Sequence, residues 1–347
     1  MLDFGVVITD ESHFGSSTDK TKTDIIDGGL VGDFMKNKIT IFASGTPNKT
    51  KTFYGINPSY VYEWETTDKS YMKKLSSDPS NEFAIEYMSK RHGPVFLNSY
   101  NDLTLDKNYQ KCPSQVLMKH TITDESIKEI NEHNTKYNTK YGYNCSSLLE
   151  LMKTPDQNNK NGYKCEEKFA LCETNDGNSI LLGFFDKIIS SSRTRKDTET
   201  IQSRRNMKLD GVANPSLIII YLPTHTGNNT ILKLQRTLKA YLKKMWIEYD
   251  IEYSNSFEES DPNSTTTSDR ATTCKEYNEY LDIIMRKTRE STPPKKGYIL
   301  LLGNKSGVGI TYKDCDVTIS LDDGHNLDNQ KQRYARALTE RDVSMLI

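Results

Sequence analysis

Short runs of apolar, β-branched residues separated by polar turns divide the chain into alternating strands and helices. Residues 4–9 form an apolar run that stops at two carboxylates, Asp10 and Glu11, as a buried parallel strand does at its carboxyl end. Residues 38–43 form a second such run, which stops at a Gly and Pro turn. A helix fits residues 28–36 between them. The pattern therefore predicts a strand, helix, strand unit of an α/β domain.

A further strand is predicted over residues 60–65, and the middle of the chain is mainly helical. Helices are expected over residues 80–91, 124–134 and 180–192, with polar loops rich in Lys and Asn between them. No fixed repeat of the solenoid kind is present. We therefore assign residues 75–205 to a linker or accessory region.

The last third of the chain returns to alternating strands and helices. Strands are predicted at residues 216–222, 246–253, 298–302 and 317–321, and helices at residues 231–244, 274–290 and from 327 onward. Residues 254–273 are rich in Ser, Thr, Asp and Asn, so they are expected to form a flexible loop with too little apolar surface to order itself. The pattern predicts two α/β domains with parallel sheets, at residues 1–74 and 206–347.

Composition permits two soluble domains and argues against several other classes. An apolar fraction of 35% suffices for ordinary cores, and 46 basic residues nearly balance 47 acidic ones, so a nucleic-acid surface would be a local patch. The six cysteines lack zinc-type spacing and are expected to be reduced thiols of an intracellular protein, without zinc. No apolar run is long enough to span a bilayer and no signal peptide precedes the first strand, so no membrane is expected.

The acidic pair Asp10 and Glu11 is the first candidate site. In motors that hydrolyse nucleoside triphosphates, an Asp at the end of a buried strand holds Mg²⁺, and the adjacent Glu orients the attacking water. By itself, an acidic pair after a strand is more often a solvated loop or a helix cap. The neighbourhood favours the first interpretation, because about thirty residues later a second strand ends in Ser44, Gly45 and Thr46.

Together these segments resemble motifs II and III of superfamily 2 helicases of the DEAD/DEAH-like kind. Residues 10–13, Asp-Glu-Ser-His, match motif II, and residues 44–46, Ser-Gly-Thr, match motif III. The resemblance implies ATP and Mg²⁺ as cofactors, with Asp10 as the metal ligand and His13 beside the nucleotide. The residues that couple the nucleotide to the nucleic acid in this family correspond to His13, Ser44, Gly45 and Thr46. The alternative is that residues 44–47 are simply a turn.

A glycine-rich segment begins at Gly303. It is not a Walker A loop, because Asn304 separates Gly303 from Lys305 and the first glycine of that motif is misplaced. In the helicase resemblance it corresponds to motif V, where Gly307 and Gly309 let the backbone approach the nucleotide or the sugar-phosphate chain. The alternative is a glycine turn between two strands.

The last predicted helix carries an arrangement that resembles motif VI. Gln332, Arg333 and Arg336 fall on the first, second and fifth positions of the family pattern Gln-Arg-x-Gly-Arg-x-x-Arg, while Ala335 replaces its glycine. Such an arginine neutralises charge on the transferred phosphoryl group from across the domain cleft. We expect Arg336 to be this catalytic arginine, with Gln332 and Arg333 beside it; whether Arg333 or Arg341 assists stays open. The alternative is a solvated basic helix.

The resemblance covers residues 1–65 and 210–342 and is similar in particular to helicases of nucleocytoplasmic large DNA viruses. It implies two RecA-like P-loop NTPase domains and an ATP-driven motor on nucleic acid, with DNA preferred to RNA as the track. It also implies a place in the host cytoplasm, the viral factory or the virion.

Motif I, the Gly-Lys-Ser/Thr loop that cradles phosphates, does not occur in the sequence. We therefore expect a piece of a longer protein, inactive by itself, whose first sheet is incomplete and exposes apolar faces. One alternative is a non-hydrolysing nucleic-acid-binding or assembly module of helicase fold. Another is the translocase subunit of a transcription-termination or restriction complex.

Overall fold

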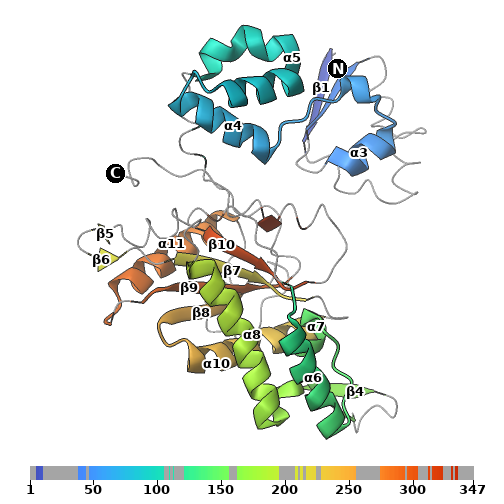
Figure 1. Cartoon of the computed structure of the whole chain (residues 1–347), viewed down its shortest axis with the longest axis vertical. Helices are drawn as coiled ribbons and strands as arrows, with labels where there is room; N and C mark the ends of the chain where they lie inside the picture. The colour runs from blue at the N-terminus through green and yellow to red at the C-terminus, as the bar shows by residue number, and fades with distance from the viewer. Residues whose placement is uncertain are drawn as a thin grey trace. The chain divides into compact units, whose positions relative to one another are not determined.

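The computed structural model divides the chain into two compact units (Figure 1). One unit comprises residues 1–69 and 327–332, and the other comprises residues 70–326 and 333–347. The residues that the structure describes are 5–10, 38–43, 47–104, 109, 112, 121–155, 162–194, 208–209, 212–213, 216–223, 228–254, 274–293, 295–303, 312, 315–322, 330 and 333–334.

The first unit is built on a parallel pair of strands. β1 (Val6–Asp10) and β2 (Ile39–Ala43) pair in register, so that Asp10 lies opposite Ala43 at the carboxyl end. α3 (Pro47–Tyr54) follows, and its Tyr54 ring stacks on Phe42 of β2 with 4.3 Å between ring centroids. One face of the strand pair is therefore covered in part by α3.

The other face of this strand pair is open. Side chains alternate across a strand, so the face away from Phe42 carries four apolar side chains that are 48–70% exposed. They are Val6, Ile8, Ile39 and Ile41. Parallel strands in complete α/β domains are covered on both faces. The sequence predicted exposed apolar faces on both sides, and the described strands expose apolar side chains on this one face.

The strand predicted over residues 60–65 is wrong. The chain forms a 3₁₀ turn there, η1 (Pro58–Tyr60), which Asn57 caps by accepting a hydrogen bond from the backbone N–H of Ser59 at 3.0 Å. The residues from 61 to 65 pair with no strand of the described chain. Alternating aromatic residues suggested a strand, but Tyr62 is 73% exposed, so the alternation covers no core.

Two helices follow this turn. α4 (Thr66–Ser77) spans the division between the units, and α5 (Glu82–Thr104) confirms the helix predicted at residues 80–91. α5 is broken at Gly93, whose φ of 68° and ψ of −157° lie outside the helical region. Glycine adopts such angles without the steric cost of a side chain, and the proline that follows cannot continue the hydrogen-bond ladder.

The second unit contains a four-stranded parallel sheet, which Figure 1 shows with α8 lying across it. The strands are β7 (Ser216–Tyr221), β8 (Tyr249–Ser254), β9 (Gly297–Leu302) and β10 (Cys315–Ser320). Their order in the sheet is β10-β7-β9-β8. α10 (Asn228–Met245) joins β7 to β8, and α11 (Cys274–Glu290) joins β8 to β9. These elements confirm the α/β class with parallel sheets, the four strands predicted in this region and the helices predicted at 231–244 and 274–290. The loop predicted at residues 254–273 and the helix predicted from 327 onward lie almost entirely outside the described residues.

Each face of this sheet has its own apolar core. Alternate residues of β7, such as Ile218 and Ile220, pack with the leucines of α10 and with Phe185 of α8. The intervening residues, such as Ile219, pack with Leu281 of α11 on the opposite face. β9 is buried along its whole length, which explains why the sequence shows a continuous apolar run there.

Residues 121–194 share the first of these cores. They form α6 (Asp124–Tyr137), α7 (Cys145–Leu148), the antiparallel hairpin β3 (Leu151–Pro155) and β4 (Tyr163–Phe169), η3 (Leu171–Glu173) and α8 (Asn175–Thr194). The helices predicted at 124–134 and 180–192 are confirmed by α6 and α8, whereas the hairpin was not predicted. A further short antiparallel pair consists of β5 (Lys208–Leu209) and β6 (Val212–Ala213). Part of residues 75–205, which we assigned to a linker or accessory region, thus packs on the four-stranded sheet of the second unit.

Candidate functional site at the carboxyl edges of the sheets

The segments that resemble motifs II and III follow neighbouring parallel strands of the first unit. Asp10 is the last residue of β1, and its backbone pairs with that of Ala43, the last residue of β2. The segments that follow both strands therefore leave from the same edge of the sheet. The side chain of Asp10 lies outside the described part of the chain, as do residues Glu11, His13, Ser44, Gly45 and Thr46.

In the second unit, described residues that follow β7 and β9 along the chain pack on opposite faces of the sheet. α10 follows β7 and packs through Leu234 and Leu238 on the first core. Tyr312, in the connection that follows β9, is buried in the second core. In open α/β sheets, ligands bind where neighbouring strands send their connections to opposite sides. The motif V glycines, Gly307 and Gly309, belong to the connection after β9 but lie outside the described residues.

Arg333 is the motif VI residue whose contacts the structure describes, and it lies at this same carboxyl edge. Its Nη1 donates to Asp322 Oδ2 at 2.9 Å and to Ser320 Oγ at 3.5 Å. The guanidinium carbon also stands 5.1 Å from the ring centroid of Tyr221. The side chains of Arg333 and Asp322 are only 8% and 14% exposed. Gln332 and Arg336 lie outside the described residues.

Gln235 joins the carboxyl ends of two strands and was not found from the sequence. It is fully buried in α10, and its Nε2 donates to the backbone oxygens of Ser254 at 3.1 Å and Leu301 at 3.2 Å. Its Oε1 is buried without a hydrogen-bond partner in the described structure. The one signal in the sequence is a polar residue beside Leu234 on the buried side of an otherwise apolar stripe. We assign Gln235 a structural role in fixing the edges of β8 and β9.

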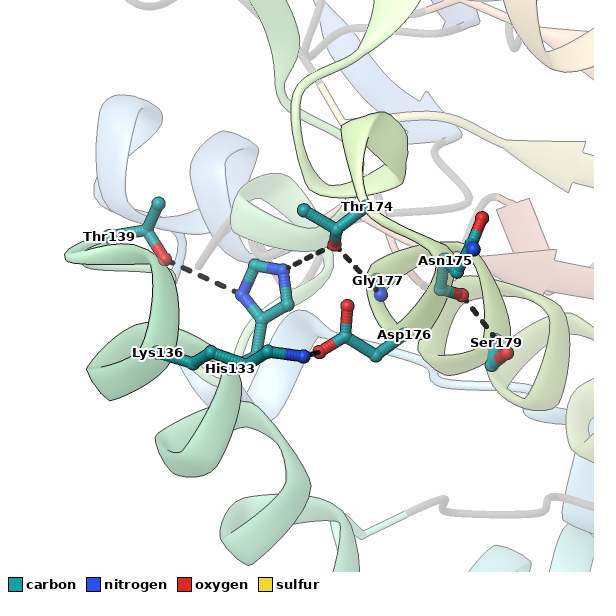
Figure 2. A network of polar contacts seen from close by, with 8 residues as sticks. All are labelled: His133, Lys136, Thr139, Thr174, Asn175, Asp176, Gly177 and Ser179. Atoms are coloured by element: carbon teal, nitrogen blue, oxygen red, sulfur yellow. Dashed lines mark hydrogen bonds and ion pairs between the residues drawn. The ribbon is translucent and has the colours of Figure 1, made fainter.

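A second polar cluster, which includes a buried histidine, joins α6 to the start of α8 (Figure 2). The Nε2 of His133 lies 2.9 Å from Thr174 Oγ1, and its Nδ1 lies 3.4 Å from Thr139 Oγ1. Thr174 Oγ1 also accepts a hydrogen bond from the backbone N–H of Gly177 at 3.1 Å, which caps the first turn of α8. The cluster holds two helices together, and none of the residues predicted to act in catalysis belongs to it.

The carboxylate of Asp176 completes this cluster. Burial alone would raise the pKa of Asp176, but hydrogen bonds from Thr174 and Tyr137 and the charge of Lys136 outweigh it and lower the pKa from 3.8 to about 2. The Lys136 ammonium is 3.5 Å from Asp176 Oδ2, as the dashed line in Figure 2 indicates. Asp176 therefore keeps its charge at neutral pH and serves as an anchor for α6.

The thiol of Cys172 does not have the properties of a nucleophile. Burial raises the pKa of Cys172 to about 11, although a hydrogen bond with Tyr241 lowers it slightly. The reactive form of cysteine is the thiolate, which is scarce at neutral pH for such a pKa. Cys172 packs beside the first core and is best explained as a core residue.

Within the described ranges, no group of three His, Cys, Asp or Glu side chains is arranged to hold a metal ion. Among the same residues, no helix combines the length and the apolar character needed to cross a bilayer. A comparison with protein-family models finds no match for the chain, and no curated protein matches it significantly.

Proposed function

We propose that the chain is part of an ATP-dependent helicase or translocase motor of RecA-like fold that moves on nucleic acid. The observation that carries the proposal is the position of the candidate motifs at the carboxyl ends of parallel strands. Motifs II and III follow β1 and β2, which are neighbours in register, and motif V follows β9 where connections diverge. Nucleotides bind at this edge in parallel α/β folds.

The acidic residues of motif II would serve the nucleotide. Asp10 stands at the end of a parallel strand, which is where a carboxylate that holds Mg²⁺ is needed, and Glu11 follows it directly. Bound Mg²⁺ would neutralise charge on the terminal phosphates. Glu11 would orient the water, His13 would contact the nucleotide, and the residues of motif III would transmit the nucleotide state to the nucleic acid.

The glycines of motif V and the arginines of motif VI would act from the second unit. Gly307 and Gly309 would bring backbone N–H groups close to phosphate oxygens, since glycine leaves no side chain in the way. Arg336 would supply positive charge to the transferred phosphoryl group, with Gln332 beside it. The motor also requires a phosphate-binding loop, which these 347 residues do not contain.

The experiment is nucleic-acid-stimulated ATP hydrolysis by the full-length protein. Glu11→Gln and Arg336→Ala should each lower the stimulated kcat by at least about 100-fold, the range seen when a catalytic base or a catalytic arginine is lost. Matched controls are Glu290→Gln and Arg286→Ala, both exposed on α11, which should keep the wild-type rate. Wild-type rates in Glu11→Gln and Arg336→Ala would refute the proposal.

The absence of a phosphate-binding loop from these 347 residues permits a second candidate, a nucleic-acid-binding or assembly module that does not hydrolyse ATP. Such a module would bind single- or double-stranded DNA with the same affinity with and without ATP. A translocase subunit of a termination or restriction complex would hydrolyse ATP on DNA without separating the strands. ATP hydrolysis, DNA binding and strand separation, measured on one preparation, discriminate the three.

A further inference from the structure

Arg333 and Asp322 form a nearly buried ion pair that belongs to the end of the second sheet. Asp322 lies two residues beyond β10, and Ser320, the last residue of β10, pairs with Tyr221 of β7. Arg333 contacts all three of these residues through its guanidinium group. A single side chain therefore connects the segment that carries motif VI to the carboxyl ends of two neighbouring strands.

We propose that Arg333 is a positioning residue, which holds the motif VI segment on the end of the second unit's sheet and does not itself contact the nucleotide, an inference that rests on the proposed function. A guanidinium that already donates to a carboxylate at close range has fewer free N–H donors and less uncompensated charge to offer to a phosphoryl group. The charge of Arg333 is neutralised at 2.9 Å by Asp322, and its side chain is 8% exposed. An arginine held in this way fixes the helix that contains it, and the charge offered to a phosphoryl group comes from elsewhere in the motif.

The energetics of buried pairs support this division of roles. Removing one member of such a pair leaves the other charge buried and unpaired, which is far more costly than the loss of an exposed ion pair. Turning the guanidinium of Arg333 toward a nucleotide would break this 2.9 Å ion pair with Asp322 and therefore carries a free-energy cost. The flat guanidinium also lies near the Tyr221 ring, a contact that lysine reproduces less well.

The test is a double-mutant cycle in the full-length protein with nucleic-acid-stimulated ATP hydrolysis as the readout. Arg333→Gln and Asp322→Asn should each lower kcat by about 10- to 100-fold through misplacement of the motif, with a smaller change in KM for ATP. The double variant should be no slower than the slower single variant, because both changes break the same pair. Arg336→Gln should cost about 1,000-fold or more whatever residue occupies position 322.

Variants that keep the charge test the same proposal if the uncharged variants Arg333→Gln and Asp322→Asn fail to fold. Arg333→Lys retains an ion pair with Asp322 and should keep kcat within about 10-fold of wild type, whereas Arg336→Lys should lose most activity. Arg236→Gln is the matched control, because its ion pair with Glu167 is longer, at 3.6 Å, and more exposed, so wild-type rates are expected.

Two results would overturn the positioning role. One is an Arg333→Gln variant as impaired as Arg336→Gln while Asp322→Asn keeps the wild-type rate. The other is additive losses in the double variant. A wild-type protein that hydrolyses no ATP would instead refute the proposed function. The ion pair itself would then be tested by the melting temperature, which Arg333→Gln and Asp322→Asn should lower non-additively by roughly 5 °C each.

Discussion

Gly177, in the first turn of α8, permits a close approach that no other residue allows. A Cβ atom added at Gly177 would lie 1.8 Å from the backbone oxygen of Leu171 and 2.9 Å from Thr174 Oγ1, whereas real Cβ contacts do not fall below 3.0 Å. The backbone of η3 or of α8 would have to move. We expect Gly177→Ala to cost about 1–3 kcal/mol through this overlap. Loss of the Thr174 cap would add about 1 kcal/mol.

Gly183 provides a matched control within the same helix. A Cβ at Gly183 would meet no atom within 4 Å. Gly183→Ala should therefore stabilise the protein by about 0.5–1 kcal/mol, because alanine favours the helix over the unfolded chain. The free energy of unfolding should therefore be lower than that of wild type in Gly177→Ala and higher in Gly183→Ala.

The assay is urea unfolding followed by the fluorescence of Trp246, which packs edge-to-face on Phe185 of α8 at 6.1 Å. Trp64 is the other of the two tryptophans and is replaced by Phe, so that the signal reports the docking of α8. Gly177→Ala should lower the urea midpoint by roughly 1 M. Equal shifts in the same direction for both glycine variants would show that the close contact at Gly177 does not exist.

Two further substitutions test the polar clusters. The pKa of Asp176 is lowered from 3.8 to about 2, so its contribution to stability is present above about pH 4 and is lost as the pH falls through 2. In wild type, the urea midpoint should fall between pH 4 and pH 2, and in Asp176→Asn this fall should be smaller. An equal fall in both proteins would contradict the lowered pKa of Asp176. Gln235→Leu removes two buried hydrogen bonds and should cost about 1–3 kcal/mol. Its neighbour Arg236, whose side chain is 28% exposed, should cost less than about 0.5 kcal/mol in Arg236→Gln. Equal losses in Gln235→Leu and Arg236→Gln would show that Gln235 does not hold the sheet edge.

The strands and helices of the second sheet could be predicted because each carries its signal within its own residues. β9 is an uninterrupted apolar run buried on both faces, and α11 repeats its apolar positions at helical spacing. The hairpin β3 and β4 could not be predicted in this way. Its strands combine lysine, glutamate and cysteine without clear alternation, and β3 reaches the core mainly through Leu151. Contacts with α10, distant in sequence, stabilise it, as when Lys233 Nζ donates to the backbone oxygen of Cys165 at 2.8 Å.

The candidate site, like the fold, could be predicted from the sequence only in part. The spacing of motif residues could be read directly, whereas the partners of those residues depend on how strands pair. Asp322 and Arg333 are eleven positions apart in the sequence, and no local pattern indicates that they touch. The contact arises because β10 pairs with β7, so that Ser320, Tyr221 and Asp322 converge on one edge.

The two edges of the second sheet differ in a way that bears on function. At the amino edge, the residues that precede β8 and β9 contact each other through a hydrogen bond and an ion pair. The backbone N–H of Lys296 donates to the oxygen of Glu248 at 2.7 Å, and the side chains of the same two residues form an ion pair. None of the predicted site residues lies in these connections. At the carboxyl edge, motif V follows β9 and Arg333 of motif VI packs against Tyr221. A helical turn or glycine loop of purely structural origin would occur at either edge, whereas nucleotide chemistry in a parallel sheet is confined to the carboxyl edge. This asymmetry is the reason to test nucleotide binding at the carboxyl edge first.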